Sequence, residues 1–471
     1  MDQIKSQVVV IGGGPGGYAA AFYAADQGKQ VILIEKDENL GGVCLNRGCI
    51  PSKALLHASK MIHEAKESAH RGIVFDNPTI NLDKLRDWKN SILGKLSGGI
   101  SALAKSRGVD VIYGRGHFEN SHTLRVETSD GQQFISFEHA IIATGSRAAL
   151  PRVFDLGNPR IMTSRGALEV EEIPEELLVI GGGYIGMELG SVYSALGSKV
   201  TLVEALPAII AAADPDLVKP VLKYAEDNFK DVRLNTKIIS MATQGPKIKV
   251  VIESPEGEQS EELFDRVLVS VGRVPANKQL GLDNTKVELD DKGFIKVNEK
   301  QQTGDSNIYA IGDCAGGMML AHKASKEARI AVEVILGEDS IWDNFVVPAV
   351  VFTDPEIAWV GLTETEAKEK GQKVKVAKFP WSASGRALTF DRTDGLTKII
   401  VCPETERVLG IGLVGHGAGE LVGEATLAVE MGATARDLAE TIHAHPTLSE
   451  TIMESAEAFF GHATHIATRK R

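Results

Sequence analysis

The chain has 471 residues, of which 43% are hydrophobic and 24% charged, and its formal net charge is −12. This composition is ordinary for a soluble globular protein, and the length suggests roughly three domains. The negative charge argues against nucleic acid as the main partner, and no uninterrupted apolar run approaches the ~20 residues of a membrane span. A first strand predicted at residues 7–11 leaves no room for a secretory signal peptide, so we expect a soluble, cytoplasmic protein in a reducing compartment.

The predicted first strand leads into a glycine-rich turn. Gly12, Gly14 and Gly17 have G-x-G-x-x-G spacing, and an Ala-rich helix and a second strand at residues 31–34 follow, ending at Glu35. In this pattern the first glycine makes the tight turn, the second lets the backbone approach a pyrophosphate, and the third packs helix on strand. We expect Glu35 to accept hydrogen bonds from a ribose diol. A plain glycine turn in an α/β domain is the alternative.

The next segment contains two of the chain's four cysteines, Cys44 and Cys49. Five residues of regular helix advance about 7.5 Å, more than the roughly 7 Å that a disulfide bridges, so the helix must be distorted or begin after Cys44. Gly48 supplies that freedom, and Pro51 suits a first helical turn. The pair predicts a redox dithiol. A structural zinc site would need two further ligands at matching spacing, and two unrelated buried thiols are the other alternative.

A second copy of the glycine pattern occurs later in the chain. Gly181, Gly183 and Gly186 follow a buried strand, and the next strand ends at Glu204. Two copies in this context indicate dinucleotide binding much more strongly than one. A carboxylate at Glu204 favours a free ribose 2′-OH, and no Arg or Lys lies within residues 205–213 to receive a 2′-phosphate, so the sequence predicts NAD rather than NADP.

Two dinucleotide sites and a dithiol predict an electron relay. A tightly held flavin can couple a mobile nicotinamide to a disulfide.

The other segments of the chain are less specific. They predict helices at 76–103, 363–370, 420–431 and 448–460 and short strands at 109–137 and 398–401. Cys314 and Cys402 follow apolar runs and are predicted to be buried thiols.

The motifs resemble those of flavoprotein disulfide reductases, the class I pyridine nucleotide-disulfide oxidoreductases, and among them the dihydrolipoamide dehydrogenases, the E3 components of 2-oxo acid dehydrogenase complexes. The resemblance runs from Gly12 to Glu450 and so covers nearly the whole chain. The similar segments are residues 41–53, Ala143-Thr144-Gly145-Ser146, Ile311-Gly312-Asp313 and residues 443–450. The resemblance implies that Ala143, Thr144, Gly145 and Asp313 contact FAD, Asp313 at the ribityl chain. From the residues alone, Asp313 could also be a helix cap.

The resemblance assigns roles to the redox residues. It implies that Cys44 exchanges with the substrate, that Cys49 faces the flavin, and that Lys53 forms an ion pair with Glu188 near flavin N5. A cation there would stabilise reduced flavin and thiolate charge. Spacing alone leaves a surface lysine and a helix-dipole glutamate as the alternative.

The resemblance also makes His445 the catalytic base and Glu450 its carboxylate partner. Dithiol oxidation needs a base because thiolate is the attacking species. A carboxylate can hold the tautomer of an imidazole and stabilise imidazolium. A metal site at His443 and His445 is a weaker alternative, and we expect no metal; His443 is expected to support the loop through a hydrogen bond.

The implied fold is α/β, with two Rossmann-like domains, a central domain and a C-terminal α+β dimerisation domain. The predicted boundaries are 1–150 for FAD binding, 151–276 for NAD binding, 277–346 for the central domain that completes the FAD site, and 347–471 for the interface domain. The implied activity is NAD⁺-dependent oxidation of dihydrolipoamide by a homodimer whose base serves the disulfide of the other subunit. The implied partners are lipoyl domains and the subunit-binding domain of E2 acyltransferases, or the glycine cleavage H protein, with no membrane and no nucleic acid.

Related reductases share several of these parts. Glu204 argues against glutathione and trypanothione reductases, of which the former prefers NADPH. Mercuric reductase and high-molecular-weight thioredoxin reductase use further C-terminal thiols or selenol, and no Cys follows Cys402. Soluble transhydrogenase lacks the cysteine pair. A purely structural assembly role would not require the dithiol and base to be intact. The complex served stays open among the pyruvate, 2-oxoglutarate, branched-chain and glycine cleavage systems.

Overall fold

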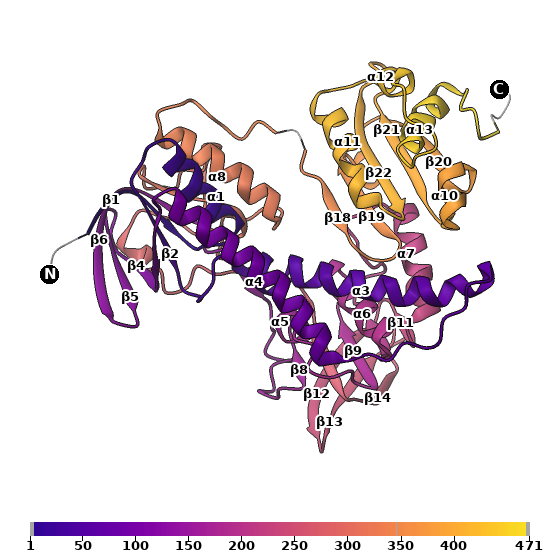
Figure 1. Cartoon of the computed structure of the whole chain (residues 1–471), viewed down its shortest axis with the longest axis horizontal. Helices are drawn as coiled ribbons and strands as arrows, with labels where there is room; N and C mark the ends of the chain where they lie inside the picture. Colours follow the sequence, from indigo (N-terminus) through magenta and orange to yellow (C-terminus); the bar gives the residue numbers. More distant parts are fainter. Residues whose placement is uncertain (1–3, 345, 468–471) are drawn as a thin grey trace.

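The computed structural model describes residues 4–344 and 346–467, and it contains three sheet-based units (Figure 1). The N-terminal unit is a seven-stranded sheet in the order β3-β2-β1-β6-β5-β4, with β17 paired to β6. Strands β1, β2, β3 and β17 run parallel to β6 or to one another, whereas β4 and β5 form an antiparallel meander with β6. The strands are β1 (Ile4–Ile11), β2 (Val31–Glu35), β3 (Asp110–Tyr113), β4 (Arg115–Asn120), β5 (Thr123–Thr128), β6 (Gly131–Ile142) and β17 (Ile308–Ala310).

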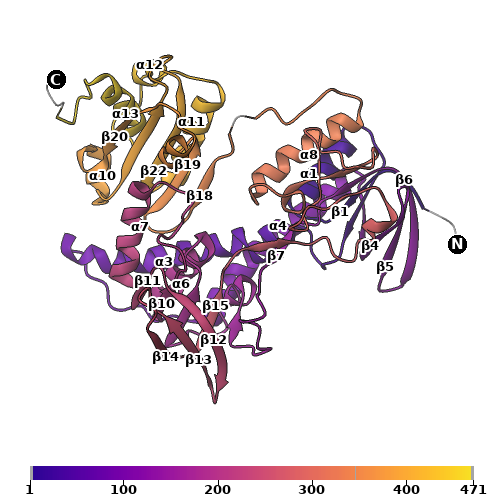
Figure 2. The ribbon, with the colours of Figure 1, turned by 180° about the vertical axis from the view of Figure 1, so that it is seen from behind.

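Helices α1 and α8 pack against each other beside this sheet, and α4 runs from it toward the middle of the molecule (Figure 1). Helix α3 crosses the middle and extends below the C-terminal unit (Figure 1 and Figure 2). The predicted helix at 76–103 begins later, at Leu82, because the Asn81 side chain caps it by accepting from the Lys84 N–H. The helices of the unit are α1 (Pro15–Asp26), α2 (Gly42–Arg47), α3 (Cys49–Glu67), α4 (Leu82–Ser106), α8 (Ala321–Ile335) and the 3₁₀ turns Ser68–Arg71, Leu282–Asn284 and Gly312–Ala315.

The middle unit repeats the parallel strand–helix–strand arrangement. Its five-stranded parallel sheet has the order β11-β10-β9-β15-β8, and an antiparallel meander β12-β13-β14 lies beside it. Two short antiparallel strands, β7 (Ser146–Ala148) and β16 (Arg273–Pro275), join the two units. The other elements are β8 (Ile161–Met162), α5 (Ser164–Ala167), β9 (Glu176–Ile180), α6 (Tyr184–Leu196), β10 (Lys199–Val203), α7 (Pro215–Asn228), β11 (Asp231–Arg233), β12 (Lys237–Gln244), β13 (Lys247–Glu253), β14 (Gln259–Phe264) and β15 (Arg266–Val269).

The C-terminal unit is an antiparallel sheet in the order β18-β19-β22-β21-β20 (Figure 2). Its helices confirm the predictions at 363–370, 420–431 and 448–460 to within two residues. The elements are β18 (Ala349–Val351), β19 (Glu356–Gly361), α9 (Glu364–Glu369), β20 (Lys375–Pro380), a 3₁₀ turn (Trp381–Ala383), α10 (Gly385–Phe390), β21 (Leu396–Val401), β22 (Val408–Gly415), α11 (Ala418–Glu430), α12 (Ala435–Glu440) and α13 (Glu450–Phe460). The predicted fold class, two Rossmann-like units followed by an α+β unit, is confirmed.

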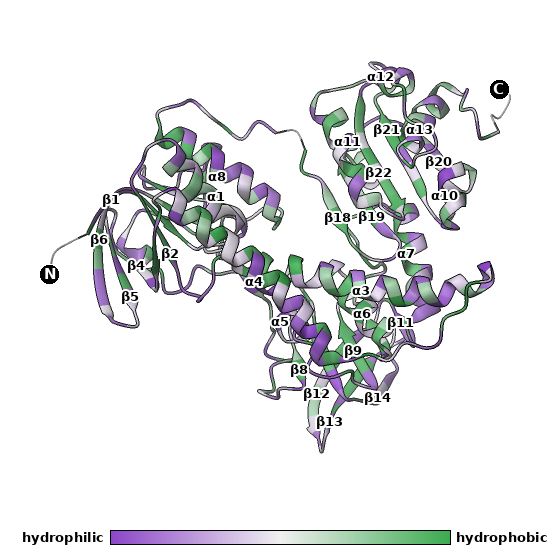
Figure 3. Cartoon of the chain, viewed as in Figure 1, coloured by the Kyte–Doolittle hydropathy of each residue, from purple (hydrophilic) through white to green (hydrophobic). Residues whose placement is uncertain are grey.

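The hydrophobic residues concentrate in the strands and on the inner helix faces (Figure 3). Strand β2 is buried along its whole length, as expected of a parallel strand covered on both faces. One apolar core crosses all three units, since Leu55 of α3 packs with the middle unit and with Val351 and Val414 of the C-terminal sheet. Within the described residues, no helix is both long and apolar enough to span a membrane.

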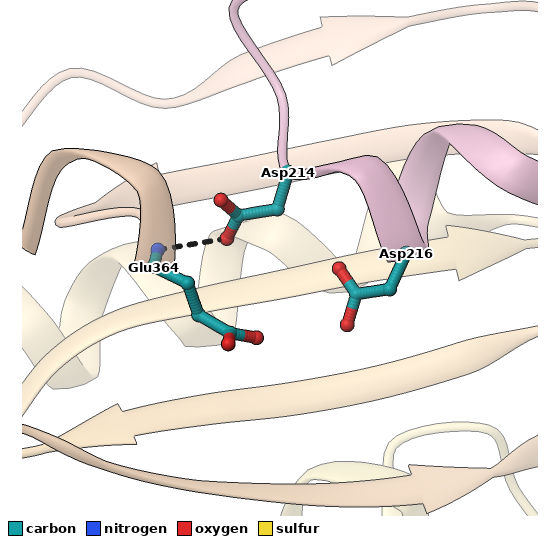
Figure 4. Close-up of side chains that lie close together, drawn as sticks. All are labelled: Asp214, Asp216 and Glu364. Carbon is teal, nitrogen blue, oxygen red and sulfur yellow. Dashed lines mark hydrogen bonds between the residues drawn. The ribbon is translucent and has the colours of Figure 1, made fainter. Parts of the chain in front are cut away.

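A charge cluster around the buried Lys398 also joins the middle and C-terminal units. Asp214, Asp216 and Glu364 bring their carboxylates together at the start of α7 and α9 (Figure 4). The buried cation among them is the Lys398 ammonium, whose side chain is only 1% exposed and which lies 2.6–2.8 Å from all three. Burial by itself would raise the pKa of Asp214. The hydrogen bonds from Lys398 and from two backbone N–H groups outweigh burial, and the net pKa is lowered.

Replacing this internal cation should destabilise the contact between the two units. In Lys398→Met the three carboxylates keep their positions and lose their buried counter-charge, which costs about 3–5 kcal/mol for a buried pair. We expect a clear fall in thermal unfolding temperature. Lys378→Met is the matched control, because Lys378 contacts Asp216 and Glu364 from a side chain that is 42% exposed. An equal, small effect of both variants would contradict a structural role for the buried ammonium.

Candidate active site

A cavity of about 610 Å³ lies between the N-terminal and middle units. It collects residues that are far apart in the sequence: the first glycine turn, the cysteine segment, the end of β6 and the start of α6. The predicted site residues that line it are Gly12, Gly14, Glu35, Cys44, Cys49, Lys53, Ala143, Thr144, Gly145, Glu188 and Asp313. The predicted residues outside its lining are Gly17, Gly181, Gly183, Gly186, Glu204, His445 and Glu450.

The first glycine turn has the geometry that dinucleotide binding requires. Gly12 has φ +108°, and a Cβ there would lie 2.3 Å from the Ala143 carbonyl oxygen. A Cβ at Gly17 would lie 1.7 Å from the Gly12 carbonyl oxygen, so only glycine lets α1 pack this closely on β1. The Gly13 N–H donates to Glu35 Oε2 at 2.7 Å, which fixes the carboxylate beside the turn.

The second turn repeats this geometry. Gly181 has φ +104°, and a Cβ at Gly186 would lie 2.0 Å from the Gly181 carbonyl oxygen. The Gly182 N–H donates to Glu204 Oε2 at 2.6 Å, as Gly13 does to Glu35. Apart from adjoining residues of the chain, no protein atom lies within 4 Å of a Cβ built on Gly183, so the backbone there is open to a ligand. The internal repeat seen in the sequence is therefore also a repeat of structure.

The cysteine segment is a broken helix. Helix α2 ends at Arg47, Gly48 has φ −150° and ψ −111°, and α3 begins at Cys49. A Cβ on Gly48 would lie 2.9 Å from the Val43 carbonyl oxygen, so glycine allows the close approach that the five-residue spacing demanded. Both cysteines are free thiols in this structure.

The two thiols have opposite acidities. The hydrogen bond from the Cys44 thiol lowers the pKa of Cys49 to about 7, and the positive charge of Lys53 assists. The same hydrogen bond, together with burial, raises the pKa of Cys44. In the reduced pair, Cys49 is therefore the more acidic thiol, and Cys44 is the one that keeps its proton.

Lys53 and Glu188 form the predicted ion pair. The Lys53 ammonium lies 3.0 and 2.8 Å from the two carboxylate oxygens of Glu188. Two further donors complete the shell: the Ser52 hydroxyl at 2.8 Å and the Phe352 N–H at 3.0 Å. Glu188 belongs to the middle unit and Phe352 to the loop after β18, so all three units meet at this carboxylate.

Asp313 also lines the cavity and is held by its neighbours. It accepts a hydrogen bond from Ser146, and the guanidinium of Arg273 lies 3.8 Å away. Arg273 itself donates to the Ser146 hydroxyl at 2.7 Å and to the Ser146 carbonyl at 2.9 Å. The neighbouring Gly312 N–H donates to the buried carboxylate of Glu327 at 2.6 Å. Asp313 is thus a fixed acceptor in the cavity wall.

These features fit FAD. The glycine turn can receive a pyrophosphate at the N-terminus of α1, the Glu35 carboxylate is placed beyond that turn, and the fixed Asp313 and the cysteine pair line the same cavity.

The sequence did not predict three residues of this site, Ser52, Arg273 and Phe352. An arginine four residues after the end of the buried strand β15 could have indicated Arg273, but no local pattern points to Phe352.

The histidine segment is separate from the cavity. His445 Nδ1 lies 2.9 Å from Glu450 Oε1, and Glu450 Oε2 accepts from the Thr447 N–H at 2.7 Å. Burial raises the pKa of Glu450, but these hydrogen bonds outweigh it and the net pKa is lowered. The His445 side chain is 73% exposed in the single chain. His443 instead contacts Glu424 at 2.6 Å, so the two imidazoles have different carboxylate partners.

The other cysteines give one confirmation and one correction. Cys314 is fully buried, as predicted. The prediction for Cys402 is wrong: it is partly exposed, and its sulfur lies 3.6 Å from Glu404 Oε2. The apolar run before it belongs to β21, which ends at Val401, so Cys402 already lies in the turn to β22.

Comparison with known proteins agrees with this geometry. Residues 6–328 match the family described as pyridine nucleotide-disulphide oxidoreductase, and residues 347–456 match its dimerisation domain, which supports a homodimer. The dihydrolipoyl dehydrogenase of Vibrio parahaemolyticus is 47% identical over 99% of this chain and 98% of its own length. That of Haloferax volcanii is 43% identical over 98% of both chains.

Two solved structures have the same fold. LpdA of Mycobacterium tuberculosis superposes with a TM-score of 0.89 at 28% identity, covering 96% of this chain and 99% of LpdA. The HOCl-induced flavoprotein disulfide reductase RclA of Escherichia coli, in its Cu(II) complex, superposes with a TM-score of 0.87 at 30% identity, covering 97% and 100%. The glycine turns, the cysteine pair and these matches together show that the chain belongs to the pyridine nucleotide-disulphide oxidoreductase family.

Proposed function

We propose that this chain is a dihydrolipoyl dehydrogenase that oxidises dihydrolipoamide on lipoyl domains and reduces NAD⁺ to NADH. The observation that carries the proposal is the single cavity in which the first glycine turn, the Cys44–Cys49 pair and the Lys53–Glu188 ion pair meet. The relatives that match over nearly their full length are dihydrolipoyl dehydrogenases. FAD, when bound, supplies a two-electron carrier between the dithiol and the nicotinamide.

The reaction starts with the Cys44–Cys49 pair as a disulfide. His445 of the partner subunit accepts the proton of one substrate thiol, and the resulting thiolate attacks Cys44 Sγ. The Cys44–Cys49 bond breaks, and Cys49 leaves as thiolate, the form that its lowered pKa favours. The second substrate thiol attacks the substrate sulfur held on Cys44, and its proton passes to the departing Cys44 sulfur. The lipoamide disulfide forms, and Cys44 leaves and takes up this proton, so two electrons have passed to the cysteine pair.

The base must come from a second chain in this proposal. Within the described part of one chain, His445 and Glu450 do not line the cavity, whereas the C-terminal unit that carries them matches a dimerisation domain. Ile442, three residues before His445, is 96% exposed, which suits a segment that a second copy covers. Glu450 then holds the tautomer of His445 and stabilises its imidazolium.

The remaining assignments are part of the same proposal. Glu35 and Glu204 would accept hydrogen bonds from the ribose hydroxyls of FAD and NAD, and the domains would divide at residues 150, 276 and 346. The partners would be lipoyl domains and the subunit-binding domain of an E2 acyltransferase, or the glycine cleavage H protein. The compartment would be the cytoplasm.

The direct test is NAD⁺ reduction by free dihydrolipoamide with the purified yellow protein. We expect rapid turnover, because the site provides the dithiol and the dimer provides the base. Oxidised glutathione with NADPH is the control reaction and should give none. Turnover in the control reaction alone would contradict the assignment of dihydrolipoamide as substrate. So would the absence of turnover in both reactions when flavin is bound. In either case the family would stand, and the substrate would be another disulfide or dithiol.

Cys49→Ser should separate folding from chemistry. The hydroxyl is smaller and cannot form the disulfide, so we expect normal flavin content and thermal stability with no oxidation of dihydrolipoamide. Cys402→Ser is the matched control, since this thiol lies in a surface turn, and it should keep full activity. Full turnover by Cys49→Ser would remove the dithiol from the mechanism.

His445→Gln should slow the substrate half of the reaction alone. Loss of a general base costs typically 10²- to 10⁴-fold, and we expect this loss in dihydrolipoamide oxidation measured at saturating NAD⁺. Electron transfer from NADH to an artificial dye does not need the base and should be largely retained. An equal loss of both activities would point to misfolding rather than to a missing base.

A further inference from the structure

Phe352 lies where the C-terminal unit reaches the redox residues. It follows β18 directly, and its backbone N–H donates to Glu188 Oε1 at 3.0 Å. The same oxygen accepts from Lys53 at 3.0 Å, while Oε2 accepts from Lys53 and from Ser52, each at 2.8 Å. The Glu188 side chain is only 4% exposed, so water cannot hydrogen-bond to it freely. The Phe352 N–H supplies a hydrogen bond that the buried carboxylate would otherwise lack.

The Phe352 side chain makes a second contact with the same ion pair. The Lys53 ammonium lies over its ring, 4.5 Å from the centroid. The face of an aromatic ring carries partial negative charge and attracts an ammonium, most strongly where water is excluded. Lys53 is therefore held from two sides, by the Glu188 carboxylate and by the Phe352 ring, which leaves 32% of its side chain exposed.

We propose that Phe352 is a positioning residue for the redox pair, holding the Lys53 ammonium where it stabilises the Cys49 thiolate. The inference rests on the redox role of Cys44 and Cys49 proposed above. Phe352 acts through Lys53 and does not itself touch the substrate. Its place in the chain means that the packing of the C-terminal unit on the other two sets the charge next to the dithiol.

The charges around Cys49 determine the direction of the effect. Cys44 and Lys53 favour the Cys49 thiolate, whereas the Glu188 carboxylate disfavours it. The phenols of Tyr18 and Tyr184 also lie within electrostatic range of Cys49. Without the ring, water and new rotamers become available to Lys53, and its ammonium moves away from the thiolate while Glu188 stays. The Cys49 pKa must then rise.

The test is the thiol titration of Phe352→Leu and Phe352→Met, which remove the ring and keep apolar volume. The holoenzyme is reduced anaerobically with one equivalent of dithiol, and the alkylation rate of the pair by iodoacetamide is followed against pH. Loss of the cation–π contact frees the Lys53 ammonium to move, so we expect the apparent thiol pKa to rise by about 0.5 unit. Alkylation at pH 6.5 should be about threefold slower. The long-wavelength absorption of the thiolate beside oxidised flavin should disappear as the pH is lowered. In both variants it should disappear at a higher pH than in the wild type.

Two variants control for packing. Phe352→Tyr keeps the ring and should titrate like the wild type. Phe390→Leu removes a comparable ring of the same unit, one that lies 4.1 Å from the Arg386 guanidinium, and should leave the titration unchanged. An unchanged titration in both ring-deleted variants, with normal flavin content, would overturn the proposal, as would an equal shift in Phe352→Tyr. Because no lipoamide is used, this result is independent of the substrate assignment.

Discussion

The buried carboxylate of Glu188 is the interaction on which the arrangement of the active site depends. A carboxylate that is 4% exposed must be fully hydrogen-bonded and paired. Its donors come from α3 of the N-terminal unit and from the loop after β18 of the C-terminal unit, while Glu188 itself belongs to α6 of the middle unit. The requirement to satisfy this one group therefore holds three units in register and places the Lys53 charge beside the cysteine pair.

The two glycine turns show how one local structure serves two purposes. Their backbone angles, their close contacts and their carboxylate hydrogen bonds are nearly the same. Their surroundings differ, because the first turn opens into the cavity that contains the dithiol and the second does not. This difference suits a resident flavin in the first site and a mobile nicotinamide in the second. The apolar core around Leu55 of α3 then keeps the second site close to the first.

The features predicted from sequence are those that depend on short stretches of chain. The glycine turns and the helix break at Gly48 follow from backbone sterics within about ten residues, and both are present as expected. Cys402 was misplaced because an apolar run shows that a strand is buried but not where its turn begins. Lys398 reads as a surface lysine in sequence, since lysine is rarely buried unless paired, and its three partners come from distant segments. Phe352 reaches the site only through tertiary packing, so no local pattern could reveal it.

The central claim is that one active site needs residues of two chains, and mixed dimers test it most directly. Cys44→Ser and His445→Gln chains with different affinity tags can be co-expressed and the heterodimers isolated. If the base acts across the dimer, one of the two sites in each heterodimer has both an intact dithiol and an intact base, and about half of the wild-type turnover should return. If the base acts within its own chain, both sites carry a defect, and heterodimers as inactive as either parent would contradict the claim.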